Sequence, residues 1–172
     1  LLQLNPRISA EDRAYVINHS EAKWIFVSDT LLPLIESIAN ELKTVQGYVI
    51  ITDKELGEVK TSLAPMYSYE ELLKEASAEY EWPMIDETSA YGACYTTGTT
   101  GKPKGVYYSH RCIYLHTMTI ADAAELSRKE VVMQITPMFH AQGWGLFFAA
   151  TLAGAKLVFP GMYAAEKPGP LV

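Results

Sequence analysis

The sequence predicts an α/β fold, a layered domain with a mostly parallel sheet flanked by helices. The first observation is an alternation: segments with helix caps or helical apolar spacing are followed by short runs of β-branched and aromatic residues. Such alternation is typical of parallel sheets. The second is composition, since 49% hydrophobic and 20% charged residues in a chain of 172 suit one domain with a sizeable core. The net charge of −6 argues against nonspecific binding of nucleic acid.

The first part of the chain has two helix–strand pairs. Ser9 is a suitable N-cap followed by acidic residues, and it predicts a helix that ends near His19. A short apolar run over 24–27 predicts the first strand. Apolar residues at helical spacing predict an amphipathic helix over 30–43, and the next apolar run predicts a buried strand over 47–52.

The middle of the chain is less regular. Residues 53–65 are polar and predict a surface loop. Ser68 and Glu71 have the spacing of a capping box, which predicts the start of a helix. The acidic stretch over 79–88 contains a proline and predicts a connection to the second half.

The second half begins with two strand-like runs around a glycine-rich loop. Ser109 then caps a predicted helix of roughly 15 residues. The remaining predicted elements are a buried strand over 131–136, a loop over 137–143, an apolar helix over 144–153 ended by Gly154, a strand over 156–159 and a loop-like tail over 160–172. No apolar run reaches the length that spans a membrane.

The most informative stretch is YTTGTTGKPKGVYYSH, over 95–110. Its glycines allow backbone N–H groups to turn toward an anion. Its threonine hydroxyls can donate to phosphate or ligate Mg²⁺, and Lys102 and Lys104 supply positive charge. The spacing excludes the Walker and dinucleotide-binding patterns. The stretch therefore predicts a polyphosphate-binding loop of another kind.

The run TTGTTGKPKG resembles the phosphate-binding signature of the adenylate-forming superfamily, which includes acyl-CoA synthetases, luciferases and peptide-synthetase adenylation domains. The resemblance implies ATP and a carboxylic acid as substrates. It implies that the loop binds the phosphates of ATP, that Lys104 is catalytic and that Thr96 ligates Mg²⁺. The phosphate-binding residues implied are Thr96, Thr97, Gly98, Thr99, Thr100, Gly101 and Lys104.

A second run, PMFHAQGWG over 137–145, resembles the segment that lines the acyl pocket of the same enzymes. The resemblance implies that His140 lies beside the carboxylate and takes part in catalysis. Amino-acid-activating relatives tend to have Asp at this position, so an amino-acid substrate is disfavoured. Trp144 matches a gating tryptophan of some long-chain members, with core packing as the competing interpretation. For Phe147 and Phe148 we favour core packing.

The resemblance is strongest to medium- and long-chain fatty acyl-CoA synthetases. It implies formation of acyl-AMP and then acyl-CoA, with ATP, Mg²⁺ and coenzyme A. Residues 1–172 are then expected to be part of the large N-terminal AMP-binding domain without the C-terminal domain, and to be inactive alone. The alternatives are a ligase for aryl or short-chain acids, a luciferase-like oxygenase, or a noncatalytic nucleotide-binding module. Both informative loops follow strands, so we expect them to share a cleft.

The remaining reactive side chains predict less. Cys94 and Cys112 lack zinc-site spacing and lie beside apolar residues, which predicts buried free thiols in a reducing, cytoplasmic compartment. We assign no chemistry to His19 or His116, and His110 is left between positioning a phosphate and capping a helix. We expect small-molecule partners and no nucleic acid. Contact with a membrane surface and homodimerisation stay open.

Overall fold

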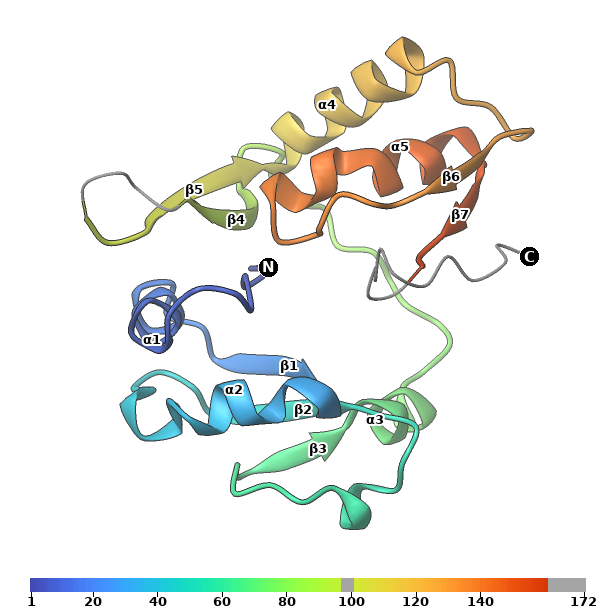
Figure 1. Ribbon diagram of the computed structural model, residues 1–172. Helices are drawn as coiled ribbons and strands as arrows, with labels where there is room; N and C mark the ends of the chain where they lie inside the picture. The colour runs from blue at the N-terminus through green and yellow to red at the C-terminus, as the bar shows by residue number, and fades with distance from the viewer. Residues whose placement is uncertain (97–100, 161–172) are drawn as a thin grey trace, which may run out of the picture. The chain divides into compact units, whose positions relative to one another are not determined.

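Helices alternate with strands along the protein in the computed structural model, which describes residues 1–96 and 101–160 (Figure 1). Each strand pair whose register is described is parallel: β1 with β2, β2 with β3, and β6 with β7. The predicted α/β class is therefore confirmed. Within residues 1–96 and 101–160, however, the strands are divided among separate small sheets and not joined in the single sheet that was expected.

The chain divides into two compact units, which we describe one at a time. The sheet unit comprises residues 4–84 and 95–105. The helix-pair unit comprises residues 1–3, 85–94 and the chain from 106 onward.

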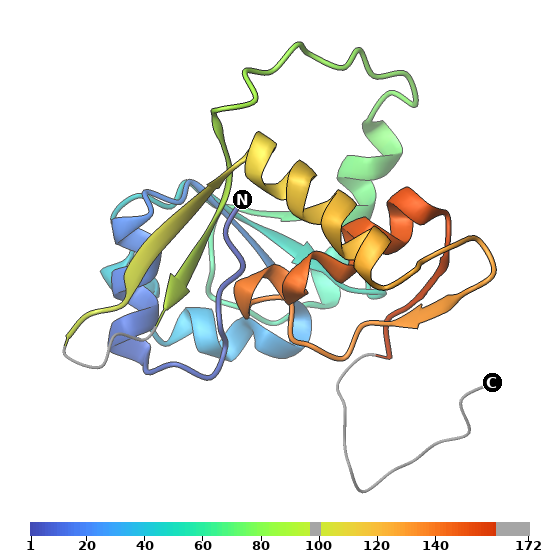
Figure 2. The same cartoon turned by 90° about the horizontal axis from the view of Figure 1, so that it is seen from above.

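The sheet unit is built on a parallel sheet with the strand order β1-β2-β3. Helix α2 lies along this sheet in both views (Figures 1 and 2). The elements are α1 Ala10–His19, β1 Trp24–Ser28, η1 Asp29–Leu31, α2 Leu32–Glu36, η2 Ala39–Glu41, β2 Gly47–Ile51, η3 Leu56–Glu58, β3 Met66–Ser68 and α3 Tyr69–Glu75. Strand β3 falls just after the predicted loop and was not predicted.

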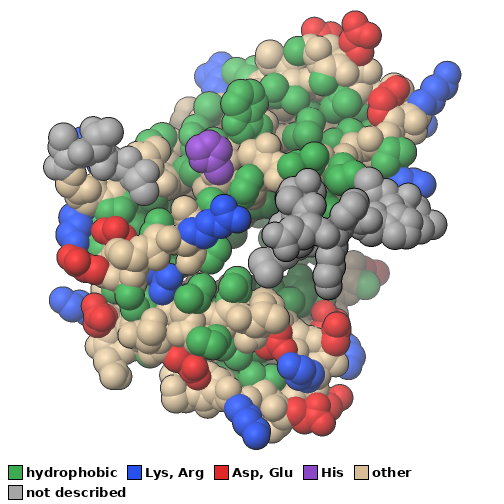
Figure 3. All heavy atoms as spheres, viewed as in Figure 1, with side chains coloured by type: hydrophobic (Ala, Val, Ile, Leu, Met, Phe, Trp, Pro, Cys, Tyr) green, Lys and Arg blue, Asp and Glu red, His purple; other side chains and the backbone are tan. Residues whose placement is uncertain are grey.

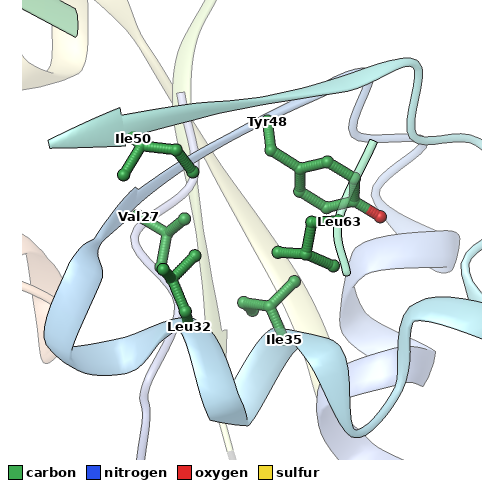
Figure 4. Packing of buried hydrophobic residues seen from close by; sticks show 6 residues of the cluster. All are labelled: Val27, Leu32, Ile35, Tyr48, Ile50 and Leu63. Atoms are coloured by element: carbon green, nitrogen blue, oxygen red, sulfur yellow. The ribbon is translucent and has the colours of Figure 1, made fainter. Parts of the chain in front are cut away.

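The core of the sheet unit lies between α2 and the strands. Val27 and Ile50 from the sheet face Leu32 and Ile35 from the helix (Figure 4). Ile50 is fully buried, and burying a side chain of this kind contributes roughly 1.5–3 kcal/mol. The cluster comprises Val27, Leu32, Ile35, Tyr48, Ile50 and Leu63.

The predicted helix over 30–43 is wrong in its extent. Helix α2 covers only Leu32–Glu36, between two 3₁₀ turns. The apolar spacing correctly predicted burial, since Ile38 is 1% exposed. The backbone groups of Glu41 and Lys43, however, pair with a side chain outside this segment. The side chain of Asn18 in α1 donates to the carbonyl of Glu41 (2.8 Å) and accepts from the N–H of Lys43 (2.8 Å). These bonds satisfy backbone groups that a continuous helix would pair within itself.

The predicted helix starts are confirmed at their caps. Ser9 Oγ accepts a hydrogen bond from the N–H of Asp12, and Ser68 Oγ accepts one from the N–H of Glu71. Ser109 does the same for Cys112 at the start of α4. These caps were predictable because a cap involves residues only three positions apart.

The helix-pair unit is dominated by α4 (His110–Ala123) and α5 (Leu146–Ala153), which lie side by side (Figures 1 and 2). Strand β6 pairs in parallel with β7, and Leu2 bridges to Ala93. Strands β4 and β5 form a two-stranded sheet whose residues are divided between the two units. The bounds are β4 Ala90–Thr96, β5 Lys104–Ser109, β6 Val131–Met133, η4 Ala141–Gly145 and β7 Lys156–Val158.

Three expectations for this half are corrected or confirmed. Strand β6 is shorter than predicted, because the side chain of Gln134 donates to the carbonyls of Thr136 and Gly143 and turns the chain there. Cys94 is buried as expected, but Cys112 is exposed, since α4 buries only Thr117. Both thiols are free. Among the described residues no helix combines the length and the apolar composition needed to cross a bilayer.

A carboxylate in the last residue of α2 gives the sheet unit a dependence on pH. Glu36 accepts hydrogen bonds from the hydroxyl of Thr61 (2.6 Å) and the N–H of Ser62 (2.9 Å), and these bonds lower its pKa. The stabilisation is present above the ordinary glutamate pKa of about 4.3 and is lost as pH falls through the lower folded-state pKa. Glu36→Gln should therefore lower the melting temperature of the full-length protein at pH 7, with a difference that closes in this acidic window.

Glu79→Gln is the matched control. Glu79 is exposed, and its carboxylate accepts no hydrogen bond among the described residues. This variant should follow the unsubstituted protein at every pH. A Glu36→Gln difference that stays constant down to pH 3 would show that these hydrogen bonds do not favour the ionised carboxylate.

Candidate functional site

Two paired strands hold the ends of the glycine-rich segment. Strand β4 ends at Thr96 and strand β5 begins at Lys104, and the two strands are neighbours that run in opposite directions (Figure 2). Both Thr96 and Lys104 are exposed. Gly101 lies in a bend before β5 and is also exposed. The other predicted phosphate-binding residues, Thr97, Gly98, Thr99 and Thr100, lie outside the described residues.

The two lysines of the segment have different surroundings. Lys102 forms an ion pair with Glu11, and its ammonium lies 5.8 Å from the centre of the Tyr15 ring. The hydrogen bond to Glu11 raises the pKa of Lys102. Lys104 has no ion pair among the described residues. The charge of Lys102 is thus directed toward α1.

Tyr95 and Gly105 explain how the two ends of the segment pack. The hydroxyl of Tyr95 lies 2.7 Å from Nδ1 of His19, within hydrogen-bond distance. A Cβ on Gly105 would lie only 3.1 Å from the tyrosine ring. Glycine at 105 therefore makes room for the aromatic ring, which a larger residue would push away from α1. Sequence reasoning assigned no role to Tyr95 or to His19 beyond its place near a helix end.

The second predicted loop contains a left-handed turn. Five consecutive residues have positive φ, from 44° to 67°: Ala141, Gln142, Gly143, Trp144 and Gly145. A non-glycine residue in this region costs roughly 1–2 kcal/mol, so contacts must hold the turn. The side chain of Gln134 donates to the carbonyl of Gly143 (3.2 Å), and Nε2 of His116 lies 3.0 Å from the carbonyl oxygen of Trp144.

The left-handed turn corrects the predicted helix over 144–153. Helix α5 begins at Leu146, so Trp144 lies before the helix. Its side chain is 63% exposed, which argues against the core interpretation. Phe147 and Phe148 are half-buried with ring centres 3.9 Å apart, in agreement with their expected packing role. His140 is exposed just before the turn. Whether these residues share a cleft with the glycine-rich segment stays a prediction.

A buried amide in the same turn was missed by the sequence reasoning. Gln142 is 3% exposed, and both polar atoms of its side chain lack a hydrogen-bond partner among the described residues. The space that it fills exists because position 92 is glycine: a Cβ on Gly92 would lie 2.8 Å from Nε2 of Gln142. Nothing local in the sequence signals this contact, because it joins residues fifty positions apart.

The helix-pair unit also contains a pocket of about 520 Å³ between α4 and α5. Hydrophobic side chains gather over these two helices on the face shown in Figure 3. The ion pair between Glu87 and Arg111 (3.4 Å) lies in the pocket wall. His110, whose role was left open, lines the same wall and packs edge-to-face on Tyr91. The lining residues are Ile85, Glu87, His110, Arg111, Ile113, Tyr114, Thr117, Phe148, Thr151 and Leu152.

The donor considered for a metal ion is a hydroxyl oxygen at the edge of the glycine-rich segment. In the described part of the chain, no group of three or more His, Cys, Asp or Glu side chains could hold a metal. Mg²⁺ at nucleotide sites takes one or two protein oxygens and completes its shell with phosphate and water. The exposed hydroxyl of Thr96 at the end of β4 fits that role.

The left-handed turn gives a direct test. Gly143→Ala should lower the melting temperature of the full-length protein, because alanine at a φ of 63° costs about 1 kcal/mol or more. The added Cβ would also lie 2.8 Å from Nε2 of Gln134. The control is Gly57→Ala, where the new methyl group meets nothing within 4 Å. Equal melting temperatures for the two variants would contradict the left-handed conformation.

Comparison with known proteins identifies the family of this site. Residues 1–171 match the family described as AMP-binding enzyme. The medium-chain-fatty-acid–CoA ligase of Ectopseudomonas oleovorans is 41% identical over 160 residues, covering 92% of this chain and 29% of that protein. The long-chain-fatty-acid–CoA ligase of Thermus thermophilus is 46% identical over 161 residues, covering 91% of this chain and 28% of that protein.

Solved structures agree on the fold. A long-chain-fatty-acid-CoA ligase from Archaeoglobus fulgidus aligns with a TM-score of 0.79 and 24% identity, covering 96% of this chain and 31% of that chain. This chain spans less than a third of the length of the two curated relatives. The match over nearly all of its residues, together with the glycine-rich segment between β4 and β5, shows that the chain belongs to the AMP-binding enzyme family.

Proposed function

We propose that the full-length protein uses ATP to activate a medium- or long-chain fatty acid as acyl-AMP and then forms acyl-CoA. The family and the two fatty-acid–CoA ligases at 41% and 46% identity support this reaction class. The observation that carries the site is the exposed Lys104, which has no ion pair among the described residues and starts β5 where the glycine-rich segment ends. It offers a positive charge to the phosphates of ATP.

The first half-reaction transfers the adenylyl group. A carboxylate oxygen of the fatty acid attacks the α-phosphorus of ATP, and the bond from that phosphorus to the bridging oxygen of pyrophosphate breaks. Negative charge grows on the leaving pyrophosphate. Lys104 and the threonine hydroxyls of the segment stabilise it by fixed electrostatic contacts. Mg²⁺ held by Thr96, when bound, would neutralise part of the phosphate charge.

The second half-reaction uses coenzyme A. Its thiol loses its proton to solvent, and the sulfur attacks the acyl carbonyl carbon of acyl-AMP. The bond from that carbon to the phosphate oxygen breaks, so that AMP leaves as the thioester forms. In this proposal His140 lies beside the reacting carboxyl group and positions it for both steps. Its exposure just before the left-handed turn is compatible with contact to a ligand.

A shorter acid is the second candidate for the substrate. The 3-methylmercaptopropionyl-CoA ligase of Ruegeria lacuscaerulensis is 37% identical over 160 residues, only slightly less than the medium-chain enzyme. A panel of acids from three to eighteen carbons, with aryl acids included, would separate the two. Acid-dependent pyrophosphate release is measured with and without coenzyme A, and a maximum at short or aryl acids would overturn the medium- or long-chain assignment.

The phosphate role of Lys104 predicts a difference between the two half-reactions. Lys104→Ala in the full-length protein should slow ATP–pyrophosphate exchange by about a hundredfold, since one lost charge-stabilising contact typically costs ~3 kcal/mol. Thioester formation from supplied acyl-AMP should change little, because pyrophosphate has already left. Thr97→Ala should give the same pattern. The control is Lys60→Ala, which removes an exposed lysine that follows η3 in the sheet unit. Equal slowing of both half-reactions would exclude a role specific to pyrophosphate.

The exposed indole of Trp144 predicts a role in chain-length selection. An exposed aromatic next to a turn can close an apolar tunnel and move when a ligand binds. Trp144→Ala should therefore leave the melting temperature nearly unchanged and alter how the KM for fatty acids depends on chain length. Trp82→Ala, which removes another exposed indole, is the control and should alter neither.

The competing core role makes the opposite prediction for the same variant. Removing a buried tryptophan costs roughly 3–5 kcal/mol of stability. A large drop in melting temperature with an unchanged chain-length profile would therefore refute the gate. Both quantities are measured on the same preparation of full-length protein.

A further inference from the structure

One face of α1 contacts both ends of the glycine-rich segment. Glu11, Tyr15 and His19 recur every four residues, so they project from the same side of the helix. His19 contacts Tyr95, one residue before Thr96. Glu11 and Tyr15 both contact Lys102 on the other side of the segment.

The contact at the first end combines a hydrogen bond with ring packing. Nδ1 of His19 and the hydroxyl of Tyr95 are 2.7 Å apart, and the two rings meet edge to face at 87° with centres 5.8 Å apart. Tyr15 also packs on His19, with ring centres 5.2 Å apart. The imidazole thus contacts both tyrosine rings, which restricts its orientation.

The contact at the second end is an ion pair supported by an aromatic ring. Lys102 reaches Glu11, and its ammonium lies over the ring of Tyr15. Both charged side chains are largely exposed, and isolated exposed ion pairs add little to the stability of a protein. The contact is better explained as orienting the chain that leads from Lys102 to Lys104. The next residue, Pro103, is buried, and Lys104 follows it.

Helix α1 can orient these residues because its opposite face is fixed. Ala14 and Ile17 pack in a buried cluster with Ile38. Arg13 is 5% exposed and donates to the carbonyls of Leu34, Pro6 and Ile8, at 3.0–3.1 Å. The helix therefore cannot turn about its axis without breaking these three hydrogen bonds.

We propose that α1 positions Thr96 and Lys104 for ATP: Glu11, Tyr15 and His19 hold Tyr95 and Lys102, which lie one and two residues away from them in the described part of the chain. The three α1 residues are positioning residues, since they act through others and not on the reacting atoms. This inference rests on the proposed binding of ATP. It also gives Lys102 a role different from that of Lys104. Lys102 pairs with Glu11 on α1, whereas Lys104 is proposed to contact phosphate.

The test measures the Kd of Mg·ATP by calorimetry and the two half-reactions, all in the full-length protein. Tyr95→Phe and His19→Ala remove the same hydrogen bond. Each should weaken ATP binding about five- to tenfold, and the double variant should be no weaker than either alone. His19→Asn keeps a polar group near the position of Nδ1 and should restore part of the affinity. Thioester formation from supplied acyl-AMP and the melting temperature should stay unchanged.

Matched controls separate positioning from general effects. Tyr67→Phe deletes a hydroxyl that has no hydrogen-bond partner in the described part of the sheet unit, and it should leave ATP binding unchanged. Lys102→Met should weaken ATP binding, and Glu11→Gln should do so to a similar degree. Lys74→Met removes an exposed charge on α3 and should have no effect.

Several outcomes would overturn the inference. Additive losses in the His19 and Tyr95 double variant would show that the two side chains act separately. Equal losses in both half-reactions, or losses that follow the melting temperature, would show a structural role only. If the unsubstituted protein binds ATP but activates no fatty acid, the proposed substrate fails while the Kd series still tests α1. If it binds no ATP, both proposals fail.

Discussion

The hydrogen bonds of Arg13 fix the place of the N-terminal helix, and much of the sheet unit depends on them. A buried guanidinium is costly unless its donors find acceptors. The two terminal nitrogens of Arg13 donate to three backbone carbonyls from segments before and after the helix, while its Nε has no partner among the described residues. The arrangement joins the approach to α1, the helix itself and α2. The buried face of α1 is thereby committed to the core, and the opposite face is committed to the glycine-rich segment.

The predictions from sequence succeeded where the decisive contacts are local. Ser9, Ser68 and Ser109 cap helices through groups three residues away, so their roles could be read from short motifs. The helix predicted over 30–43 failed because Asn18, far away in the sequence, supplies bonds to the backbone after α2. The helix predicted from Trp144 failed because the residues before Leu146 adopt positive φ, which apolar periodicity does not reveal.

The same distinction applies to the candidate site. The glycine-rich run and its threonines and lysines could be recognised from composition and spacing alone. Which of the two lysines pairs with a carboxylate in the described part of the chain could not, because the partner of Lys102 is Glu11, 91 positions earlier. Likewise, the amide of Gln142 in the left-handed turn fits because Gly92 on β4 leaves space for it. A single sequence does not reveal contacts between residues that lie this far apart along the chain.

The four-residue spacing on α1 has a consequence for how this segment can vary. An α-helix turns about 100° for each residue, so adding or removing one residue between Glu11 and His19 would rotate one contact away from the other. Replacing a side chain on this face would weaken a single contact, whereas a change in length would break the correspondence between the two ends of the segment. The length of the helix thus fixes the position of one contact relative to the other. Its residue count from Glu11 to His19 should tolerate less change than the identity of any one residue on it.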